Sequence, residues 1–164
     1  MPYCPIIGTL GYLVSEDRHK VLLIERNARP DDEHFGKVNG LGGKLERDED
    51  VVSGLRREFR EEAAIELTTI TLRGTISWPG FGRNGEDWLG FVFLAHGFEG
   101  TLPTANEEGA LVWHDVSALL AGELPLWDGD PHFLPLVFDD DPRPFHGVMP
   151  YEQGHAVGWS YVRL

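Results

Sequence analysis

Hydrophobic residues recur along the chain with two different periods, and the shorter period predicts β-strands. Apolar residues alternate or run together over residues 6–14 and again over residues 21–26, with a polar turn at residues 15–20 between them. Two apolar runs joined by a short polar connection are typical of a β-hairpin. Further strands are predicted at residues 68–78, 87–96, 111–114, 145–150 and 157–162.

Residues 49–63 show the longer period, which is that of an α-helix. The apolar residues lie three or four positions apart, so they form one stripe along the helix. The helix can bury this stripe and leave its other faces free. The stripe consists of Val51, Val52, Leu55, Phe59 and Ala63.

Two polar segments and a glycine cluster predict where the regular elements stop. Residues 27–37 and 80–86 are polar and contain turn-forming residues, so we expect both segments to be loops. Gly40, Gly42 and Gly43 predict a break in the chain directly before the long helix.

The remaining elements complete a mixed pattern in one domain. Short helices are predicted at residues 116–121, with Asp115 as the N-cap, and at residues 131–138. The whole pattern predicts an α+β or α/β fold in which helices flank a mixed sheet. A length of 164 residues is enough for one sizeable core, so we expect a single domain over residues 1–164.

The chain is strongly acidic, and this charge narrows the class of partner. It carries 27 acidic and 14 basic residues, which give a formal net charge of −13. Nucleic-acid binding relies on Lys and Arg side chains that displace counterions, so DNA, RNA and anionic membranes are poor partners for this chain. A small phosphorylated molecule is a suitable ligand if a cation mediates the contact.

Cysteine content and hydropathy bear on the cellular compartment. Cys4 is the only cysteine, which excludes an intrachain disulfide and a cysteine-based metal site. No stretch approaches the roughly 20 apolar residues needed to cross a bilayer. Residues 5–14 are apolar but lack the basic leader and cleavage site of a signal peptide. We therefore expect a cytoplasmic protein.

Three carboxylates gather on one face of the predicted long helix. Glu58, Glu61 and Glu62 stand at positions i, i+3 and i+4. A solvated charged face is the commoner use of such residues. Here, however, like charges repel each other, and the helix dipole disfavours negative charge near the C-terminal end. Gly54, on the same side, is also a poor helix former. Carboxylate oxygens suit hard cations such as Mg²⁺, so the pattern predicts a metal site that meets phosphates.

The helix and the residues around it resemble the Nudix signature, G-x5-E-x7-R-E-U-x-E-E-x-G-U, in which U is a bulky apolar residue. The one departure is Ala64, where the family has glycine. Since glycine favours the left-handed conformation that often ends a helix, Ala64 can alter the turn that follows. The positions in register, within residues 43–65, are Gly43, Glu49, Arg57, Glu58, Phe59, Glu61, Glu62 and Ile65.

This resemblance implies a Nudix-type α/β/α sandwich and a metal-dependent hydrolase. It implies that the three helix carboxylates bind Mg²⁺, for which Mn²⁺ can substitute, and that the Gly42 carbonyl adds a ligand. Arg57 is expected to orient the carboxylates through an ion pair, with Glu49 in an outer position. One of these glutamates, or another from a distant loop, is expected to remove the proton from the attacking water.

Segments outside the signature resemble the Nudix enzymes that hydrolyse oxidised purine nucleoside triphosphates. Residues 39–44 are similar to the segment that precedes their helix, and Glu108 corresponds to a later glutamate that binds metal and takes part in catalysis. Residues 126–130 are similar to their base pocket, except that Gly129 replaces an acidic residue. The base-binding residues implied in this way are Asn39, Trp127 and Asp130.

The chemistry of these side chains agrees with base recognition. An amide or a carboxyl group can pair with a purine edge, and an indole can stack on its face. The same residues also occur as turn, core and capping residues in other proteins. Arg26 and Lys44 can steer phosphates or serve as ordinary surface charges. The histidines, His34 among them, show no pairing typical of a zinc site, and we expect them to be structural or solvent-facing.

The expected function is Mg²⁺-dependent hydrolysis of a nucleoside triphosphate, with 8-oxo-dGTP as a candidate, to a nucleoside monophosphate and pyrophosphate. Two alternatives stay open. The substrate can be another linked nucleoside diphosphate, such as a dinucleoside polyphosphate, a nucleotide sugar or a dinucleotide cofactor. The chain can also be a Nudix module that senses a nucleotide without cleaving it. The expected partner is a small nucleoside polyphosphate, and the oligomeric state stays open.

Overall fold

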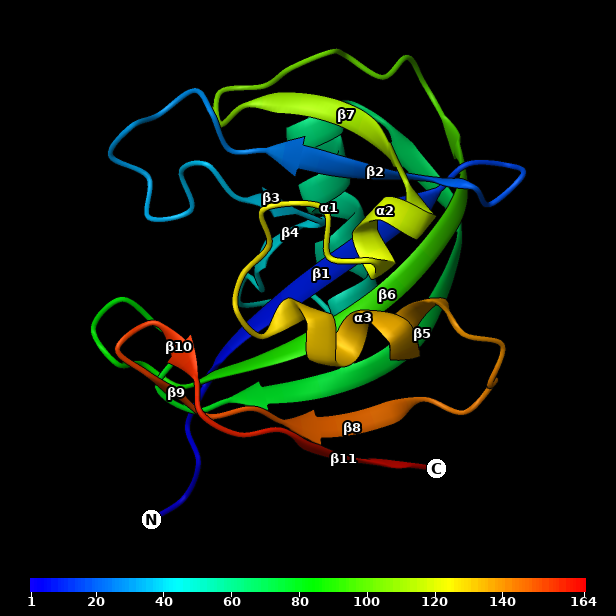
Figure 1. Cartoon of the computed structure of the whole chain (residues 1–164). Coiled ribbons are helices and arrows are strands. Elements are labelled where there is room, and N and C mark those ends of the chain that lie inside the picture. The colour runs from blue at the N-terminus through cyan, green and yellow to red at the C-terminus, as the bar shows by residue number, and fades with distance from the viewer.

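A computed structural model describes residues 1–164 and shows a large mixed sheet with helices on both faces (Figure 1). This confirms the predicted fold class. The helices are α1 (Val51–Ala63), α2 (Val116–Leu120) and α3 (Asp130–Phe138). The strands are β1 (Ile6–Val14), β2 (Lys20–Glu25), β3 (Val38–Asn39), β4 (Leu41–Lys44), β5 (Glu66–Trp78), β6 (Trp88–Glu99), β7 (Ala110–Asp115), β8 (Phe145–Val148), β9 (Tyr151–Glu152), β10 (His155–Ala156) and β11 (Ser160–Arg163).

The sheet is organised around β1, which pairs with three other strands. The strand order is β11-β8-β5-β6-β1-β2-β3, with β4 paired to β1 and β7 paired to β2. β1 runs parallel to β6 along its whole length. Its other edge is shared, because residues 8–11 pair antiparallel with β4 and the last two residues pair antiparallel with β2. The sheet therefore opens beside β1.

Two hydrophobic cores lie on opposite faces of this sheet. One core contains Leu55, Phe59 and Ala63 of α1, which are fully buried as the apolar stripe predicts. The other contains Phe133 and Val137 of α3. Figure 1 shows α1 behind the sheet and α2 and α3 in front of it. None of these helices combines the length and the apolar composition that crossing a bilayer requires.

The predicted break at the glycine cluster occurs only at Gly40, which separates β3 from β4, whereas Gly42 and Gly43 lie inside β4. The absence of side chains is what permits the pairing. A Cβ atom at Gly42 would collide with the carbonyl oxygen of Thr9, and a Cβ atom at Gly40 would lie 2.8 Å from that of Gly11. Glycine at these positions lets the backbone of this segment approach β1 closely.

The long helix begins at Val51, two residues later than predicted, because Asp50 caps it. Its carboxylate accepts hydrogen bonds from the backbone N–H groups of Val52 and Ser53, both at 2.9 Å. The helix ends at Ala63, as predicted. Gly54 has a packing role, since a Cβ atom there would lie 2.7 Å from Leu45.

Other boundaries also differ from the prediction. Asp115 is the N-cap residue of α2, as predicted, but its side chain makes no capping hydrogen bond and pairs with Lys20 across β2 and β7 instead. The predicted strand at residues 145–150 ends at Val148, and a short hairpin, β9–β10, follows that the prediction lacked.

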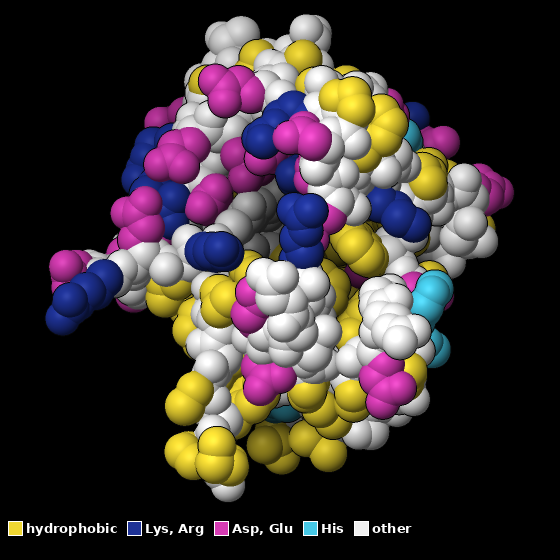
Figure 2. Space-filling view, turned by 90° about the vertical axis from the view of Figure 1, so that its left-hand side faces the viewer, with side chains coloured by type: hydrophobic (Ala, Val, Ile, Leu, Met, Phe, Trp, Pro, Cys, Tyr) yellow, Lys and Arg dark blue, Asp and Glu magenta, His cyan; other side chains and the backbone are white.

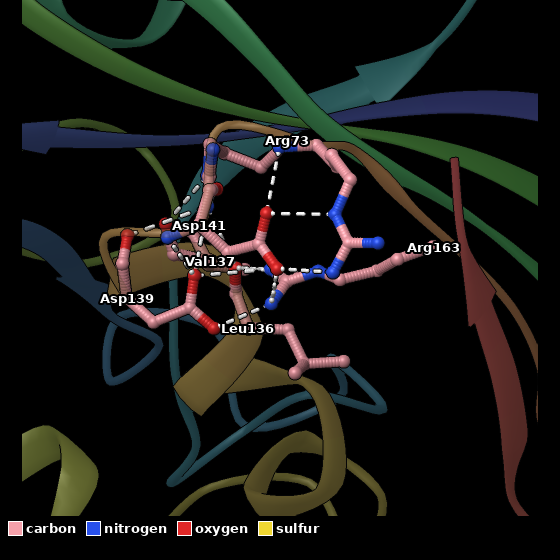
Figure 3. Close-up of polar contacts among 7 residues, drawn as sticks. Arg73, Leu136, Val137, Asp139, Asp141 and Arg163 are labelled. Atoms are coloured by element: carbon pink, nitrogen blue, oxygen red, sulfur yellow. Dashed lines mark hydrogen bonds and ion pairs between the residues drawn. The ribbon is translucent and has the colours of Figure 1, made fainter.

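A buried arginine anchors the C-terminal end of α3 (Figure 3). Arg73 lies at a β-bulge in β5 and is only 6% exposed. Its guanidinium donates to the carbonyl oxygens of Val137 (3.0 Å) and Asp141 (2.9 Å) and pairs with the Asp139 carboxylate (3.1 Å). Arg163 of β11 pairs with the same carboxylate at 2.7 Å. Carbonyl groups that a helix end leaves unpaired are thereby satisfied, and α3 is held in one orientation.

Replacing Ala64 with glycine should stabilise the protein. Ala64 ends α1 with φ 55° and ψ 30°, the left-handed conformation in which the family has glycine. For alanine this conformation costs about 1–2 kcal/mol, partly offset by the greater freedom of glycine in the unfolded chain. We expect the free energy of unfolding, measured in urea, to rise by about 0.5–1.5 kcal/mol.

Ala118→Gly is the matched control, because Ala118 lies inside α2. We expect Ala118→Gly to lower the free energy of unfolding by about 1 kcal/mol. A comparable loss in Ala64→Gly would show that no conformational strain is stored at this helix end.

Candidate active site

A cavity of about 600 Å³ opens where several loops meet. The segments 27–37 and 79–87 and the β9–β10 hairpin lie on one side of the molecule, on the left in Figure 1. Figure 2 views this side and shows a hollow with Lys and Arg side chains at its rim and acidic side chains beside it. The cavity walls come from β1, β3, β4, α1, the 79–87 segment and residues 127–130.

Three glutamates form the acidic end of the cavity. Glu58 and Glu62 reach it from α1, and Glu108 reaches it from the connection before β7. Burial raises the pKa of Glu62, and the neighbouring Glu58 and Glu108 carboxylates raise it further. The backbone at Glu62 is held towards this connection, because its carbonyl accepts a hydrogen bond of 3.0 Å from the Asn106 side chain.

Arg57 holds the acidic end in place from behind. Its guanidinium donates to Glu49 at 2.6 Å, to Glu58 at 2.9 Å and to the Lys44 carbonyl at 3.1 Å. The pKa of Arg57 is raised, chiefly by the hydrogen bonds to Glu49. Arg57 therefore fixes the direction of the Glu58 carboxylate and ties α1 to β4.

Glu61 does not join Glu58 and Glu62 in the cavity. Its side chain is 58% exposed and lies 3.3 Å from Arg57, on the outer side of the helix. No group of three His, Cys, Asp or Glu side chains is arranged as a set that could hold a metal ion. A site that uses Glu61 as a ligand therefore requires its side chain to rotate away from Arg57.

The chemistry of the acidic end nevertheless fits a hard divalent cation. All its donor groups are carboxylate oxygens, and the Gly42 backbone also lines the cavity. The raised pKa of Glu62 has burial and crowding by carboxylates as its cause. A divalent cation would relieve this crowding in place of a proton.

Cationic side chains line the cavity next to the acidic end. Arg26 pairs with Glu108 at 2.9 Å and with Asp32 at 2.8 Å. The Lys44 ammonium lies 5.7 Å from the centre of the Trp88 ring. Arg83, from the segment predicted as a plain connection, lines the cavity as well. These side chains provide positive charge for a polyphosphate in a protein whose net charge is −13.

The opposite part of the cavity, its aromatic end, contains the three predicted base-binding residues. Asn39, Trp127 and Asp130 all line it, and the side-chain amide nitrogen of Asn39 is buried without a hydrogen-bond partner. Burial raises the pKa of Asp130 to about 7, against the smaller lowering effects of a backbone hydrogen bond at Trp127 and of Lys37. The cavity therefore offers one free amide donor and one carboxyl group that is partly protonated near neutral pH.

Several residues of the aromatic end were not predicted as site residues, and His34 among them was expected to be structural or solvent-facing. Phe81 packs edge-to-face against Trp127 at 5.7 Å and against Tyr151 at 5.0 Å. His34 accepts a hydrogen bond of 2.8 Å from the Trp127 indole N–H. The aromatic residues around Phe81, at positions 78 and 88, were the only local signal that the 79–87 segment forms part of a site.

Comparisons with known proteins find similar sequences over most of this chain. A family model described as the NUDIX domain matches residues 6–137. The uncharacterized Nudix hydrolase YvcI of Bacillus subtilis is 32% identical over 136 residues, which cover 80% of this chain and 79% of that protein. An oxidized purine nucleoside triphosphate hydrolase of Danio rerio is 30% identical over 122 residues, which cover 74% of each.

A solved structure extends the similarity to nearly the whole fold. The crystal structure of a MutT protein from Bacillus halodurans superimposes with a TM-score of 0.79 at 26% sequence identity. The match covers 95% of this chain and 97% of that one, so the similarity extends beyond the residues that the family model matches.

The raised pKa of Asp130 leads to a prediction about stability. Its pKa of about 7 in the folded protein lies above the ordinary value of 3.8, so the folded state disfavours ionisation. The protonated Asp130 side chain therefore contributes to the stability of the folded protein. This contribution is fully present below pH 4 and is lost as the pH rises through about 7. We expect the stability of Asp130→Asn relative to the wild type to increase across this range, by up to about 4 kcal/mol.

Denaturant unfolding of both proteins between pH 4 and pH 8 measures this difference. The difference in the free energy of unfolding between Asp130→Asn and the wild type should increase up to about pH 7 and then stay constant. A gap that does not change with pH would show that Asp130 ionises freely in the folded protein.

Proposed function

The chain belongs to the NUDIX family of hydrolases, which act on pyrophosphate bonds of nucleotide derivatives, and we propose that its substrate is a nucleoside triphosphate, with oxidised purine forms such as 8-oxo-dGTP as the leading candidates. The products would be a nucleoside monophosphate and pyrophosphate. One observation carries this proposal. The same cavity has carboxylates and cations at one end and, at the other, aromatic walls with an unpaired amide donor.

The aromatic end supports a purine as the base. The free amide nitrogen of Asn39 can donate to a ring nitrogen or carbonyl oxygen, and a protonated Asp130 can donate a second hydrogen bond. A buried donor without a partner is unfavourable, so a ligand that supplies an acceptor removes this penalty on binding. The relative from Danio rerio, described as an oxidized purine nucleoside triphosphate hydrolase, supports the same substrate class.

Gly129 stands where the similar enzymes have an acidic residue, and other groups of this chain occupy the space that its side chain would need. A Cβ atom at Gly129 would collide with the Met149 sulfur and lie 2.6 Å from the Tyr151 hydroxyl. The Tyr151 hydroxyl accepts a hydrogen bond of 3.1 Å from the Gly129 backbone. Base selection in this chain therefore relies on Asn39 and Asp130, without a second carboxyl group.

The acidic end supports a divalent cation, for which we propose Mg²⁺. Glu58, Glu62 and Glu108 would hold it, with Gly42 and a rotated Glu61 as further ligands. When bound, the ion would acidify a water molecule and neutralise phosphate charge. Arg57 keeps the Glu58 carboxylate directed into the cavity, and Arg26 and Lys44 attract and orient the phosphate chain.

Neutralising one carboxylate at the acidic end should nearly abolish turnover. We expect Glu62→Gln and Glu58→Gln to lower kcat/KM by roughly 10²–10⁴-fold, because each removes a charge that acts on the reacting water or the cation. The measurement is the release of pyrophosphate from 8-oxo-dGTP and dGTP with Mg²⁺. Glu107→Gln is the matched control, since Glu107 is exposed and adjacent to Glu108 but does not line the cavity. Equal rates in all four proteins would remove the acidic end from the reaction.

A substrate panel distinguishes the proposed substrate from the other linked nucleoside diphosphates. Nucleoside triphosphates, dinucleoside polyphosphates, nucleotide sugars and dinucleotide cofactors are each incubated with the protein and Mg²⁺ or Mn²⁺, and pyrophosphate and phosphate are detected separately. We expect pyrophosphate from purine nucleoside triphosphates, and no activity with a chelator present. Turnover of nucleotide sugars or dinucleotides alone would overturn the proposed substrate. Binding without turnover would indicate a sensing module.

A further inference from the structure

The segment between β2 and β3, residues 27–37, contacts both ends of the cavity. It was predicted as a plain loop, yet it contributes side chains to the cavity wall. Two of its residues, Asp32 and His34, make directed hydrogen bonds to side chains that belong to other segments. We refer to residues 27–37 as the bridging loop.

Asp32 organises the bridging loop from within. One of its carboxylate oxygens accepts a hydrogen bond of 2.8 Å from the Arg26 side chain, and the other accepts one of 3.0 Å from the backbone N–H of His34. The Asp32 side chain is only 10% exposed, so both contacts are shielded from water. One carboxylate thus places Arg26 beside the acidic end and also sets the backbone at His34.

His34 in turn holds Trp127, which lies 93 positions away in the sequence. The Trp127 indole N–H donates to Nδ1 of His34 at 2.8 Å, and the two rings meet edge-to-face at 5.1 Å. Lys37, also in the bridging loop, places its ammonium 5.8 Å from the centre of the same indole and donates to the Leu126 carbonyl at 3.2 Å. The indole is therefore held at its edge and over its face by the same loop.

These contacts determine the plane of the indole. A tryptophan side chain rotates about two bonds, and the Trp127 ring packs edge-to-face against Phe81. The hydrogen bond to His34 selects one orientation, because the indole has a single N–H donor. Stacking of a base depends on a ring plane that is set before the ligand arrives.

We propose that Asp32 and His34 are positioning residues that hold Trp127 as the stacking surface for the base, and that they thereby set the preference for purine over pyrimidine nucleotides. This inference rests on the proposed function, in which the aromatic end of the cavity receives a base. Neither residue belongs to the Nudix signature. His34 acts on Trp127 directly, whereas Asp32 acts through the backbone of His34 and also holds Arg26 beside the acidic end.

The first test measures the Trp127 indole directly and needs no substrate. In a ¹H–¹⁵N spectrum, the indole resonance, assigned through Trp127→Phe, should move upfield in His34→Ala because the hydrogen bond is lost. His34→Asn should keep most of the wild-type shift, since the asparagine amide oxygen can occupy the place of Nδ1. Asp32→Ala should displace the same resonance, and the double variant should move it no further. His132→Ala is the control, because His132 stacks on Trp159 and not on Trp127.

The second test measures steady-state kinetics with dGTP, 8-oxo-dGTP and dCTP. We expect His34→Ala to raise KM for the two purine nucleotides about tenfold, with kcat within about twofold of the wild type, as for the loss of one hydrogen bond of about 1.4 kcal/mol. KM for dCTP should change by less than about threefold, and His34→Asn should restore most of the purine KM.

The two tests separate failure of this inference from failure of the proposed function. An unchanged Trp127 resonance in both His34→Ala and Asp32→Ala overturns the positioning role, whatever the enzyme hydrolyses. A displaced resonance together with equal changes in KM for all three nucleotides overturns the role in base preference. A wild-type protein that hydrolyses no nucleoside triphosphate refutes the proposed function, and the spectra still decide whether Asp32 and His34 hold the indole.

Discussion

The pairing of one largely buried arginine with several carboxylates is the interaction on which the site depends. Arg57 is 17% exposed and contacts Glu49 and Glu58 at hydrogen-bond distance. Gathering carboxylates on one helix is unfavourable by itself, because like charges repel and the protein as a whole is acidic. The guanidinium compensates this repulsion, and its bond to the Lys44 carbonyl fixes α1 against β4. Without Arg57 the Glu49 and Glu58 carboxylates would lose the positive charge that compensates their repulsion.

The sheet provides the space that this arrangement needs. β1 divides its edge between β4 and β2, so the sheet opens there and a cavity forms beside α1. Glycine in β4 allows the close approach to β1, and the side chain of Glu58 occupies the space beside Gly43. The same glycines thus serve the packing of the sheet and the placement of a carboxylate.

The aromatic end is held by contacts from outside the signature. Arg73 and Arg163 fix the C-terminal end of α3 through Asp139, and the first residue of this helix is Asp130. The hydrogen bond from Trp127 to His34 joins the chain before α3 to the bridging loop. A cavity with charged groups at one end and aromatic groups at the other suits a ligand with the same division, such as a nucleotide.

The sequence by itself determined the features that depend on local periodicity and on a long, specific motif. These are the helix that carries Glu58 and Glu62, most of the strands and the family. Only the tertiary structure decided that the 41–44 segment pairs with β1, that Glu61 turns outward to Arg57, and that Phe81, Arg83 and His34 line the cavity. Periodicity reports which face of an element is apolar, but side chains from distant segments meet only through long-range packing. The bond between His34 and Trp127 spans 93 positions, and no local pattern encodes a contact at that separation.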